Sequence, residues 1–183
     1  MVGPGWWSVA ELTYPQIGLT RELLRDGPES VAGWPGGNQR VFERIEVGRG
    51  AESFGRLSSG ILDWGSQEAA GLRPRAEGPA VLGARVVCGF GVGPIRLPVP
   101  CEVVWSERGE RFGGFGYGTL TGHPASGEEA FAAELDEADR VWFSVLAFSR
   151  PRPGIYTLAA PVSRLMQKFV TRKYLVAARA LAE

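Results

Sequence analysis

The C-terminal end of the chain contains one long helical stripe, and this stripe follows a run of segments that read as strands. Its apolar residues recur at three- and four-residue spacing between Leu158 and Leu181, which is the periodicity of an amphipathic helix. No other amphipathic stretch in the 183 residues is as long. A twisted sheet has to bury one of its faces against another layer, and we expect this helix to supply that layer.

About five consecutive strands are expected before the helix. Their segments, at residues 80–90, 98–105, 112–121, 128–135 and 140–149, are separated by glycine, proline and acidic turns, as in an antiparallel sheet. A further strand at 40–47 and a helix at 51–64 precede them. Because Gly55 and Gly60 each weaken that helix by about 1 kcal/mol relative to alanine, its stability must depend on packing.

This order of elements predicts an α+β fold in which a curved antiparallel sheet wraps around the long C-terminal helix. Such a helix-grip arrangement is that of START and Bet v 1 domains, and it leaves a cavity between the sheet and the helix. A length of 183 residues suits one domain spanning 1–183. The turn-rich, aromatic segment 1–40 is expected to pack on the sheet as part of that domain.

Composition limits the partners and cofactors. The net charge is zero, so the chain lacks the positive charge of a nucleic-acid binder. Its apolar runs fall far short of the ~20 residues of a membrane span, and its start lacks the pattern of a signal peptide; we expect a soluble, cytoplasmic protein without an integral membrane segment. One histidine and two dispersed cysteines, Cys88 and Cys101, do not form a usual metal-ligand set, so no metal or cofactor is predicted. Both thiols are expected to be buried and free, and a disulfide between them is the lesser alternative. The composition does not indicate an oligomeric state.

The charges are unevenly distributed along the chain. Residues 102–139 contain nine acidic and two basic side chains, whereas residues 150–179 contain seven basic side chains and no acidic one. The favoured interpretation is that the basic C-terminal segment pairs with the acidic middle. The alternative is a basic helix face, with Arg164, Lys168 and Arg172 at four-residue spacing, that binds an anionic membrane surface or partner.

The segment 114–121 combines two different strand faces. Three glycines at 114, 116 and 118 share one face, whereas Phe115, Tyr117, Thr119 and Thr121 share the other. Three glycines destabilise a strand, so either the strand bends or aromatic side chains cover the exposed backbone; the N-terminal tryptophans are candidates for that cover. The Tyr117 and Thr119 face is then expected to line the cavity, where Tyr117 offers an apolar ring and a hydroxyl.

Two further sites carry possible chemistry. His123, the single histidine, precedes Glu128 and Glu129 by five and six residues; it could act as a general acid or base oriented by one of these carboxylates, or simply cap a proline turn. Arg150, at the end of the last strand, could hold a carboxylate or phosphate in a bidentate contact, or form a salt bridge with Glu128 or Glu129.

Several of these segments resemble a family of domains of unknown function, number 1990. The block Tyr117-Gly-Thr-Leu, Gly122-His-Pro and Gly127-Glu-Glu-Ala-Phe carries most of the similarity, which covers roughly residues 14–180. Other matching pieces are Tyr14, Gly18-Leu-Thr-Arg21, Gly48-Arg-Gly50, Pro100-Cys-Glu-Val-Val104, Ala147-Phe-Ser-Arg-Pro151, Gln167 and Thr171-Arg-Lys-Tyr174. The resemblance implies a START-like fold and no particular activity, and Glu102 replaces an expected basic residue.

Three functions remain open at this point. The leading hypothesis is the binding of a small hydrophobic molecule in the sheet–helix cavity, with Tyr117, Thr119, His123 and Arg150 as polar anchors. A cofactor-independent enzyme, such as a cyclase or hydrolase, would instead use His123 with Glu128 or Glu129. An interaction module would use the basic face of the C-terminal helix.

Overall fold

The computed structural model describes residues 10–27, 33–92, 95–152 and 160–183, with the side chains of 90–92, 95 and 160–168 also left out of the description. The helices are α1 (Leu19–Asp26), α2 (Gly50–Leu62), α3 (Gly65–Ala69) and α5 (Ala160–Ala182). The strands are β1 (Gln39–Arg49), β2 (Arg75–Ala76), β3 (Arg85–Val92), β4 (Ile95–Arg108), β5 (Phe112–Thr119), β6 (Ala125–Leu135) and β7 (Arg140–Pro151).

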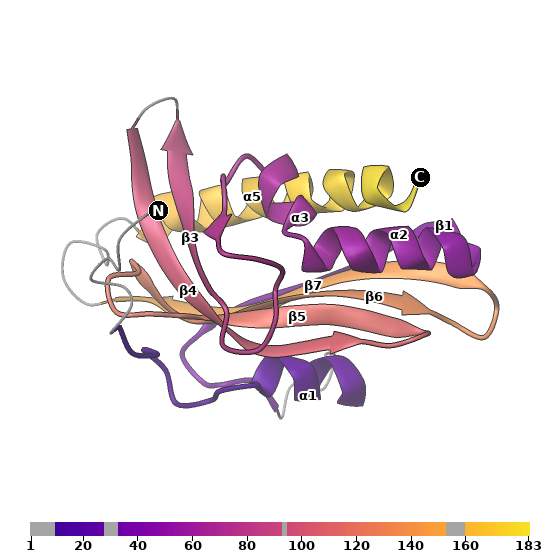
Figure 1. Cartoon of the computed structure of the whole chain (residues 1–183). Coiled ribbons are helices and arrows are strands. Elements are labelled where there is room, and N and C mark those ends of the chain that lie inside the picture. The colour runs from indigo at the N-terminus through magenta and orange to yellow at the C-terminus, as the bar shows by residue number, and fades with distance from the viewer. Residues whose placement is uncertain (1–9, 28–32, 93–94, 153–159) are drawn as a thin grey trace.

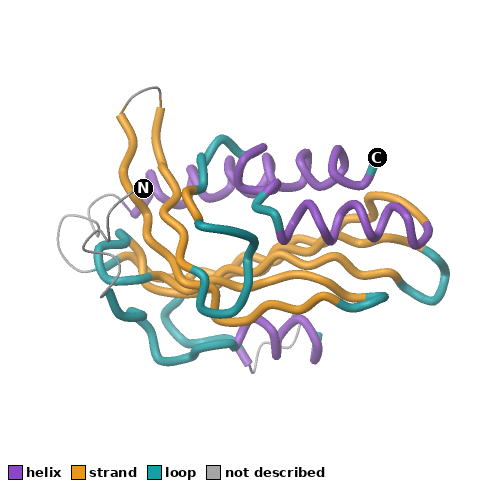
Figure 2. The backbone as a smooth tube through the Cα atoms, in the orientation of Figure 1, coloured by secondary structure: helices purple, strands orange, loops and turns teal. Residues whose placement is uncertain are grey.

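All seven strands belong to one antiparallel sheet. Their spatial order is β1-β7-β6-β5-β4-β3-β2, so β3 to β7 are successive neighbours and β1 returns to pair with β7. The sheet is curved, and α2, α3 and α5 lie on one side of it while α1 lies on the other (Figures 1 and 2). This confirms the α+β, helix-grip class predicted from the order of elements. None of the helices in the described ranges is long and apolar enough to cross a membrane.

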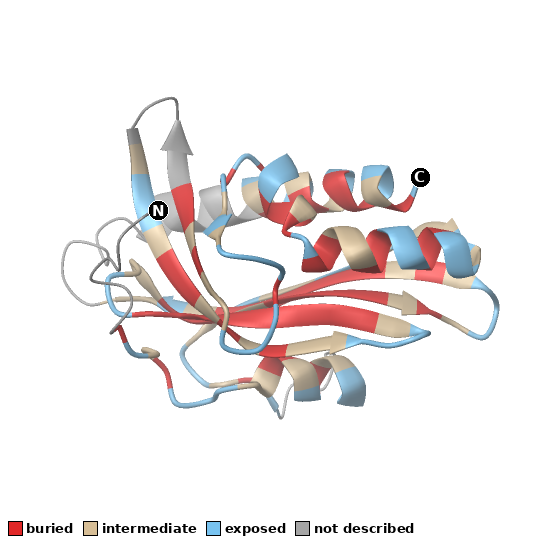
Figure 3. Cartoon of the chain, in the orientation of Figure 1, coloured by how far each residue is buried: buried red, intermediate tan, exposed pale blue. Residues whose placement is uncertain are grey.

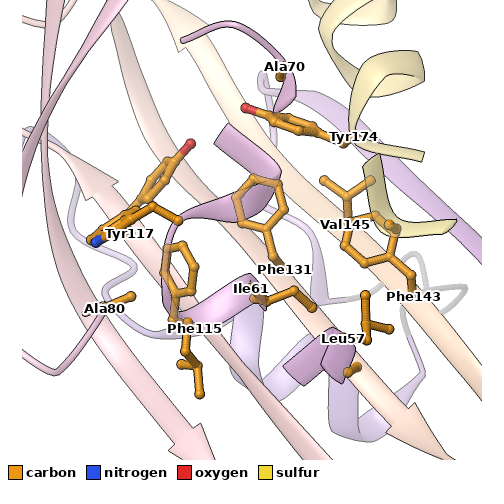
Figure 4. Packing of buried hydrophobic residues seen from close by; sticks show 14 of the residues in the cluster. Leu57, Ile61, Ala70, Ala80, Phe115, Tyr117, Phe131, Phe143, Val145 and Tyr174 are labelled. Atoms are coloured by element: carbon orange, nitrogen blue, oxygen red, sulfur yellow. The ribbon is translucent and has the colours of Figure 1, made fainter. Parts of the chain in front are cut away.

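The main core lies between the sheet and the α2/α5 side, which we call the inner face. Phe115, Phe131 and Phe143 on the strands are fully buried, and Tyr174 of α5 packs with them; the buried residues concentrate along the central strands (Figure 3) and interlock as shown in Figure 4. Helix α2 also packs against β5 and β6. Helices α2 and α5 therefore cover the sheet together, whereas the sequence pattern predicted that the C-terminal helix alone would cover it.

The opposite, outer face carries a smaller core made largely by the N-terminal segment. Tyr14, Leu23 and Trp34 pack there against Leu146 and Phe148 of β7. Helix α1 belongs to this layer and was not expected from the sequence. Its first residue follows Gly18, which has a left-handed φ of 83° and provides no side-chain cap, so the usual local signal for a helix start is missing.

Aromatic side chains cover the glycine face of β5, as anticipated, and within the described residues they are those of Trp105 and Tyr14. A Cβ at Gly116 would overlap the indole nitrogen of Trp105, and one at Gly118 would overlap the hydroxyl of Tyr14. These rings can approach only because the strand has no side chains there. Trp6 and Trp7 lie outside the described residues, and Trp34 packs in the outer core.

Among the described residues, the acidic middle of the chain pairs mainly with arginines from the first half. The expected pairing with the basic C-terminal segment stays a prediction, because the side chains of 160–168 lie outside the described residues. Described ion pairs join Arg21 and Arg25 to Glu107, Arg44 to Glu134, Arg85 to Glu102 and Arg140 to Asp136. Within the described part of α5, no basic side chain forms an ion pair. Arg172 is exposed there, whereas the side chains of Arg164 and Lys168 lie outside the described residues, so the basic-face hypothesis stays a prediction.

A buried glutamine in α3 provides a test of the packing around α5. Gln67 is fully buried, and both polar atoms of its side chain lack a hydrogen-bond partner among the described residues. Because burying unpaired polar atoms costs free energy, Gln67→Met is expected to raise the free energy of unfolding by about 1 kcal/mol, measured by urea denaturation. Gln16→Met, at an exposed position, is the control, and its free energy of unfolding should be close to that of the wild type. A lower free energy of unfolding in Gln67→Met would contradict the conclusion that the buried Gln67 side chain is unpaired.

Candidate functional site

The candidate site is a pair of polar residues on the inner face of the sheet. Tyr117 of β5 and Glu129 of β6 lie directly opposite each other in the strand register. The Tyr117 hydroxyl donates a hydrogen bond of 2.7 Å to Oε2 of Glu129. Because side chains alternate along a strand, the same alternation that buries Phe115 and Phe131 points both of these residues toward the helices.

Glu129 combines partial accessibility with a strongly desolvating environment. Its side chain is half-buried, yet burial by the surrounding protein raises its pKa to about 7, and the hydrogen bond from Tyr117 only partly offsets this effect. No basic side chain in the described residues pairs with it. A carboxyl group in such a setting exists in both protonation states near neutral pH, and can either donate or accept a hydrogen bond.

The surroundings of this pair are neutral and aromatic. Tyr174 of α5 packs edge-on against Phe131, with ring centroids 4.8 Å apart, and its hydroxyl interacts with that of Tyr117; Figure 4 shows both hydroxyls directed toward the same region. Burial raises the pKa of Tyr117 and of Tyr174 well above the usual value, so both phenols stay protonated. The polar groups here therefore act as hydrogen-bonding groups rather than as fixed charges.

Two buried thiols lie on the same face of β3 and β4. Cys88 and Cys101 are both free, as the sequence analysis expected. Burial raises the pKa of Cys88 to about 12 and that of Cys101 well above its usual value, which keeps both thiols neutral and unreactive. In the described ranges, no group of three or more His, Cys, Asp and Glu side chains could hold a metal ion.

Glu128 points to the other face of the sheet and has a structural role. Its carboxylate, 2% exposed, accepts hydrogen bonds from the Tyr14 hydroxyl at 2.7 Å, the Gly18 amide at 2.8 Å and the Thr20 amide at 2.9 Å. The hydroxyl of Thr20 is a fourth donor. Two of these donors are backbone amides at the start of α1, so Glu128 caps that helix from a distant strand.

His123 caps its own turn and is paired with neither glutamate. The Ala125 amide donates a 2.9 Å hydrogen bond to Nδ1 of the ring. Burial lowers the pKa of His123 to about 4, with the positive charge of Arg152 adding to the effect. The ring is thus neutral at pH 7, and the expected acid–base pair of His123 with Glu128 or Glu129 is not formed; the turn-capping alternative describes what the structure contains.

Thr119 and Arg150 also lie apart from the Tyr117–Glu129 pair. The Thr119 hydroxyl accepts a 3.0 Å hydrogen bond from the Gly127 amide and contacts the hydroxyl of Thr13 at 2.6 Å, which ties the N-terminal segment to the sheet. Arg150 is exposed opposite Ser126, on the same sheet face as Glu128. Of the six candidate residues, the structure brings together Tyr117 and Glu129, and it distributes the other four elsewhere.

The sequence analysis missed Tyr174 as a member of this cluster. Its position, four residues after Val170 and four before Ala178, continues the buried stripe of α5, so the helical periodicity could have identified it. The predicted cavity itself falls partly on residues 153–168, whose side chains lie outside the described residues. The described residues include those on the sheet side of the expected cavity, which are Tyr117, Glu129 and their aromatic neighbours.

Solved structures with a similar fold are distant in sequence. A 1.88 Å crystal structure of a hypothetical protein from Helicobacter pylori has a TM-score of 0.63 at 14% identity, covering 94% of this chain and 96% of that one. Norcoclaurine synthase from Thalictrum flavum has a TM-score of 0.55 at 11% identity, covering 79% and 86%. At such identities the likeness concerns the fold alone.

Sequence relatives are closer. A UPF0548 protein of Arabidopsis thaliana is 33% identical over 137 residues, 70% of this chain and 66% of that protein. A UPF0548 protein of Deinococcus radiodurans is 32% identical over 180 residues, 91% of this chain and 83% of that protein. The model of the domain of unknown function DUF1990 matches residues 13–177. The chain therefore belongs to the DUF1990 family.

Proposed function

We propose that this protein binds a small, mainly apolar molecule between the inner face of the sheet and α5, and that Tyr117 and Glu129 anchor a polar group of that molecule. The observation that carries the proposal is the 2.7 Å hydrogen bond between these two side chains on an otherwise apolar face. An ionisable group in a protein core normally has a charged partner, and no described basic side chain provides one for Glu129.

The chemistry of the cluster favours a neutral ligand with a hydroxyl or amino group. Phe115, Phe131 and Tyr174 give the pair aromatic, apolar surroundings, while Glu129 can accept or donate one hydrogen bond according to its protonation state. A few convergent polar groups in an apolar lining are typical of small-molecule sites. Norcoclaurine synthase, whose fold is similar, was crystallised with dopamine and hydroxybenzaldehyde, and this supports the idea that such a scaffold accommodates small aromatic molecules.

The proposal can be tested with 2-naphthol, a neutral aromatic probe with one hydroxyl group. We expect saturable 1:1 binding by fluorescence titration at pH 7, weakened roughly 10-fold or more by Glu129→Gln or Tyr117→Phe because each removes or alters an anchoring hydrogen bond. Glu134→Gln is the control, since Glu134 lies on the same strand but is 44% exposed and pairs with Arg44. Absence of saturable binding, or equal affinity in all variants, would contradict the proposal.

A second candidate function is proton transfer to or from the bound molecule. Its support is the pKa of Glu129, about 7, together with the adjacent Tyr117 hydroxyl; a catalytic group works best with a pKa near the operating pH. In this form of the enzyme hypothesis, Glu129 is the acid–base group and His123 takes no part. A molecule recovered with the protein and incubated in D2O would gain carbon-bound deuterium with the wild type and not with Glu129→Gln, whereas no gain at carbon with either protein would leave binding as the function.

A further inference from the structure

A groove opens on the outer side of the sheet, away from the Tyr117–Glu129 pair. Three segments form it: residues 11–13 of the N-terminal segment, the β5–β6 connection and start of β6 with Thr121 and Ser126, and residues 150–152 at the end of β7. Its volume is about 490 Å³, which lies within the usual range of small-molecule sites, roughly 300–1,000 Å³.

Backbone hydrogen bonds hold the three segments together. The Thr121 amide donates to the Glu11 carbonyl at 2.9 Å, and the Thr13 amide donates to the Thr119 carbonyl at 3.1 Å. On the other wall, the Arg152 amide donates to the Pro124 carbonyl at 3.0 Å. The groove is therefore built into the sheet rather than formed by loosely attached loops.

The hydroxyl groups of the groove already donate hydrogen bonds within the protein, whereas the Arg150 side chain has no described partner. The Ser126 hydroxyl donates to the Thr13 carbonyl and the Thr121 hydroxyl to the Glu11 carbonyl, so neither hydroxyl proton is available. Arg150 is exposed and, among the described residues, forms neither an ion pair nor a hydrogen bond through its side chain. Arg150 is therefore an exposed residue of the groove lining whose side chain has no described partner.

The charge around the groove favours a single anionic group. Arg150 and Arg152 contribute two positive charges, and Glu11 is the one acidic residue of the lining. His123 in the adjoining turn stays neutral because burial and the charge of Arg152 both lower its pKa, to about 4. A guanidinium group matches the geometry of a carboxylate or phosphate, while Glu11 would repel a polyanion.

We propose that this groove is a second binding site, for a small molecule with one carboxylate or phosphate group, and that Arg150 is the residue that binds this anionic group. Both ligand types share the planar or tetrahedral oxyanion that an arginine fork recognises. The site lies on the sheet face opposite Glu129, so it does not depend on the function proposed for the inner face.

Calorimetric titrations with benzoate and with phenyl phosphate, at low ionic strength, test the second site. We expect 1:1 binding of at least one of them, weakened roughly 10-fold or more in Arg150→Gln because a charge-assisted hydrogen bond is lost. Glu11→Gln is expected to tighten binding several-fold by removing a repulsive charge. Whichever compound binds more tightly identifies the preferred anion.

Arg108→Gln is the matched control, because Arg108 is exposed at the far end of β4 and its guanidinium donates, within the described residues, to the Ser59 hydroxyl alone. It should leave both titrations unchanged. The proposal is overturned if neither compound binds saturably at millimolar concentrations. It is also overturned if Arg150→Gln and Arg108→Gln weaken binding equally, since that pattern indicates non-specific attraction to surface arginines.

Discussion

Replacing Glu128 with alanine is expected to lower the free energy of unfolding by about 3–5 kcal/mol, because hydrogen bonds to a buried charged group are strong and their loss leaves buried donors unpaired. Four donors converge on this carboxylate, from Tyr14, Gly18 and Thr20. Urea denaturation measures the change. Since two of the donors are amides at the start of α1, hydrogen exchange in residues 19–26 should accelerate more than exchange in the central strands.

Glu134→Ala is the control for this prediction. Glu134 lies on the same strand and the same face as Glu128, but its side chain is 44% exposed and its partner Arg44 is 38% exposed. An exposed ion pair contributes ~1 kcal/mol or less, so the control should be nearly as stable as the wild type. Equal stability losses in the two variants would show that Glu128 does not hold the N-terminal segment on the sheet.

The pH dependence of stability is expected to report the unusual environment of Glu129. Its folded-state pKa, about 7 against an ordinary value of 4.5, means that the native protein keeps a proton which the unfolded chain has already released. Stability from this group is therefore fully present below pH 4.5 and is lost as the pH rises toward 7. The loss amounts to about 2 kcal/mol, after allowance for partial exposure of the side chain.

His123 changes the stability in the direction opposite to Glu129, over an overlapping pH range. Its pKa falls from 6.5 to about 4 on folding, so its contribution to stability is lost as the pH falls from 6.5 toward 4. The wild type should thus change little between pH 4.5 and 6.5. Glu129→Gln should instead gain stability relative to the wild type as the pH rises from 4.5 to 7, and His123→Asn should gain relative stability as the pH falls.

Denaturation curves of the three proteins across this range measure both effects. A constant stability difference between the wild type and Glu129→Gln at all pH values would contradict the raised pKa, and with it the desolvated setting of the site. A constant difference for His123→Asn would contradict the burial of the histidine ring without affecting the conclusions about Glu129.

The fold was predictable from sequence where the signal is local periodicity. The helix expected at 51–64 is α2 at 50–62, the strand expected at 140–149 is β7 at 140–151, and the C-terminal helix is α5. Helix α1 was not predictable, because its cap is Glu128, more than 100 residues away. The start of β6 at Ala125, rather than at 128, likewise depends on pairing with the end of β7, a contact between strands that no local pattern reports.

The candidate site could be predicted only in part, because local patterns do not report contacts between strands. Alternation along β5 correctly placed Tyr117 on the face opposite the glycines. Alternation along β6 implied that Glu128 and Glu129 point to opposite faces, but it could not indicate which of them faces the helices; that choice depends on the register between Tyr117 and Glu129. His123 and Thr119 are near these residues in sequence, yet backbone capping and contact with the N-terminal segment give them other surroundings. Arg150 lies opposite Ser126 at the end of β7, on the other face of the sheet from Glu129.

The central claim is that the inner face binds a small molecule through Tyr117 and Glu129. Native mass spectrometry of the protein purified from its own host tests this claim most directly, because it requires no prior choice of ligand. We predict that the wild type has an additional small-molecule mass, and that this mass is absent or strongly reduced in Glu129→Gln and retained in Glu134→Gln. A wild-type protein found only at the mass of its own chain, or a ligand retained equally by Glu129→Gln, would contradict the account.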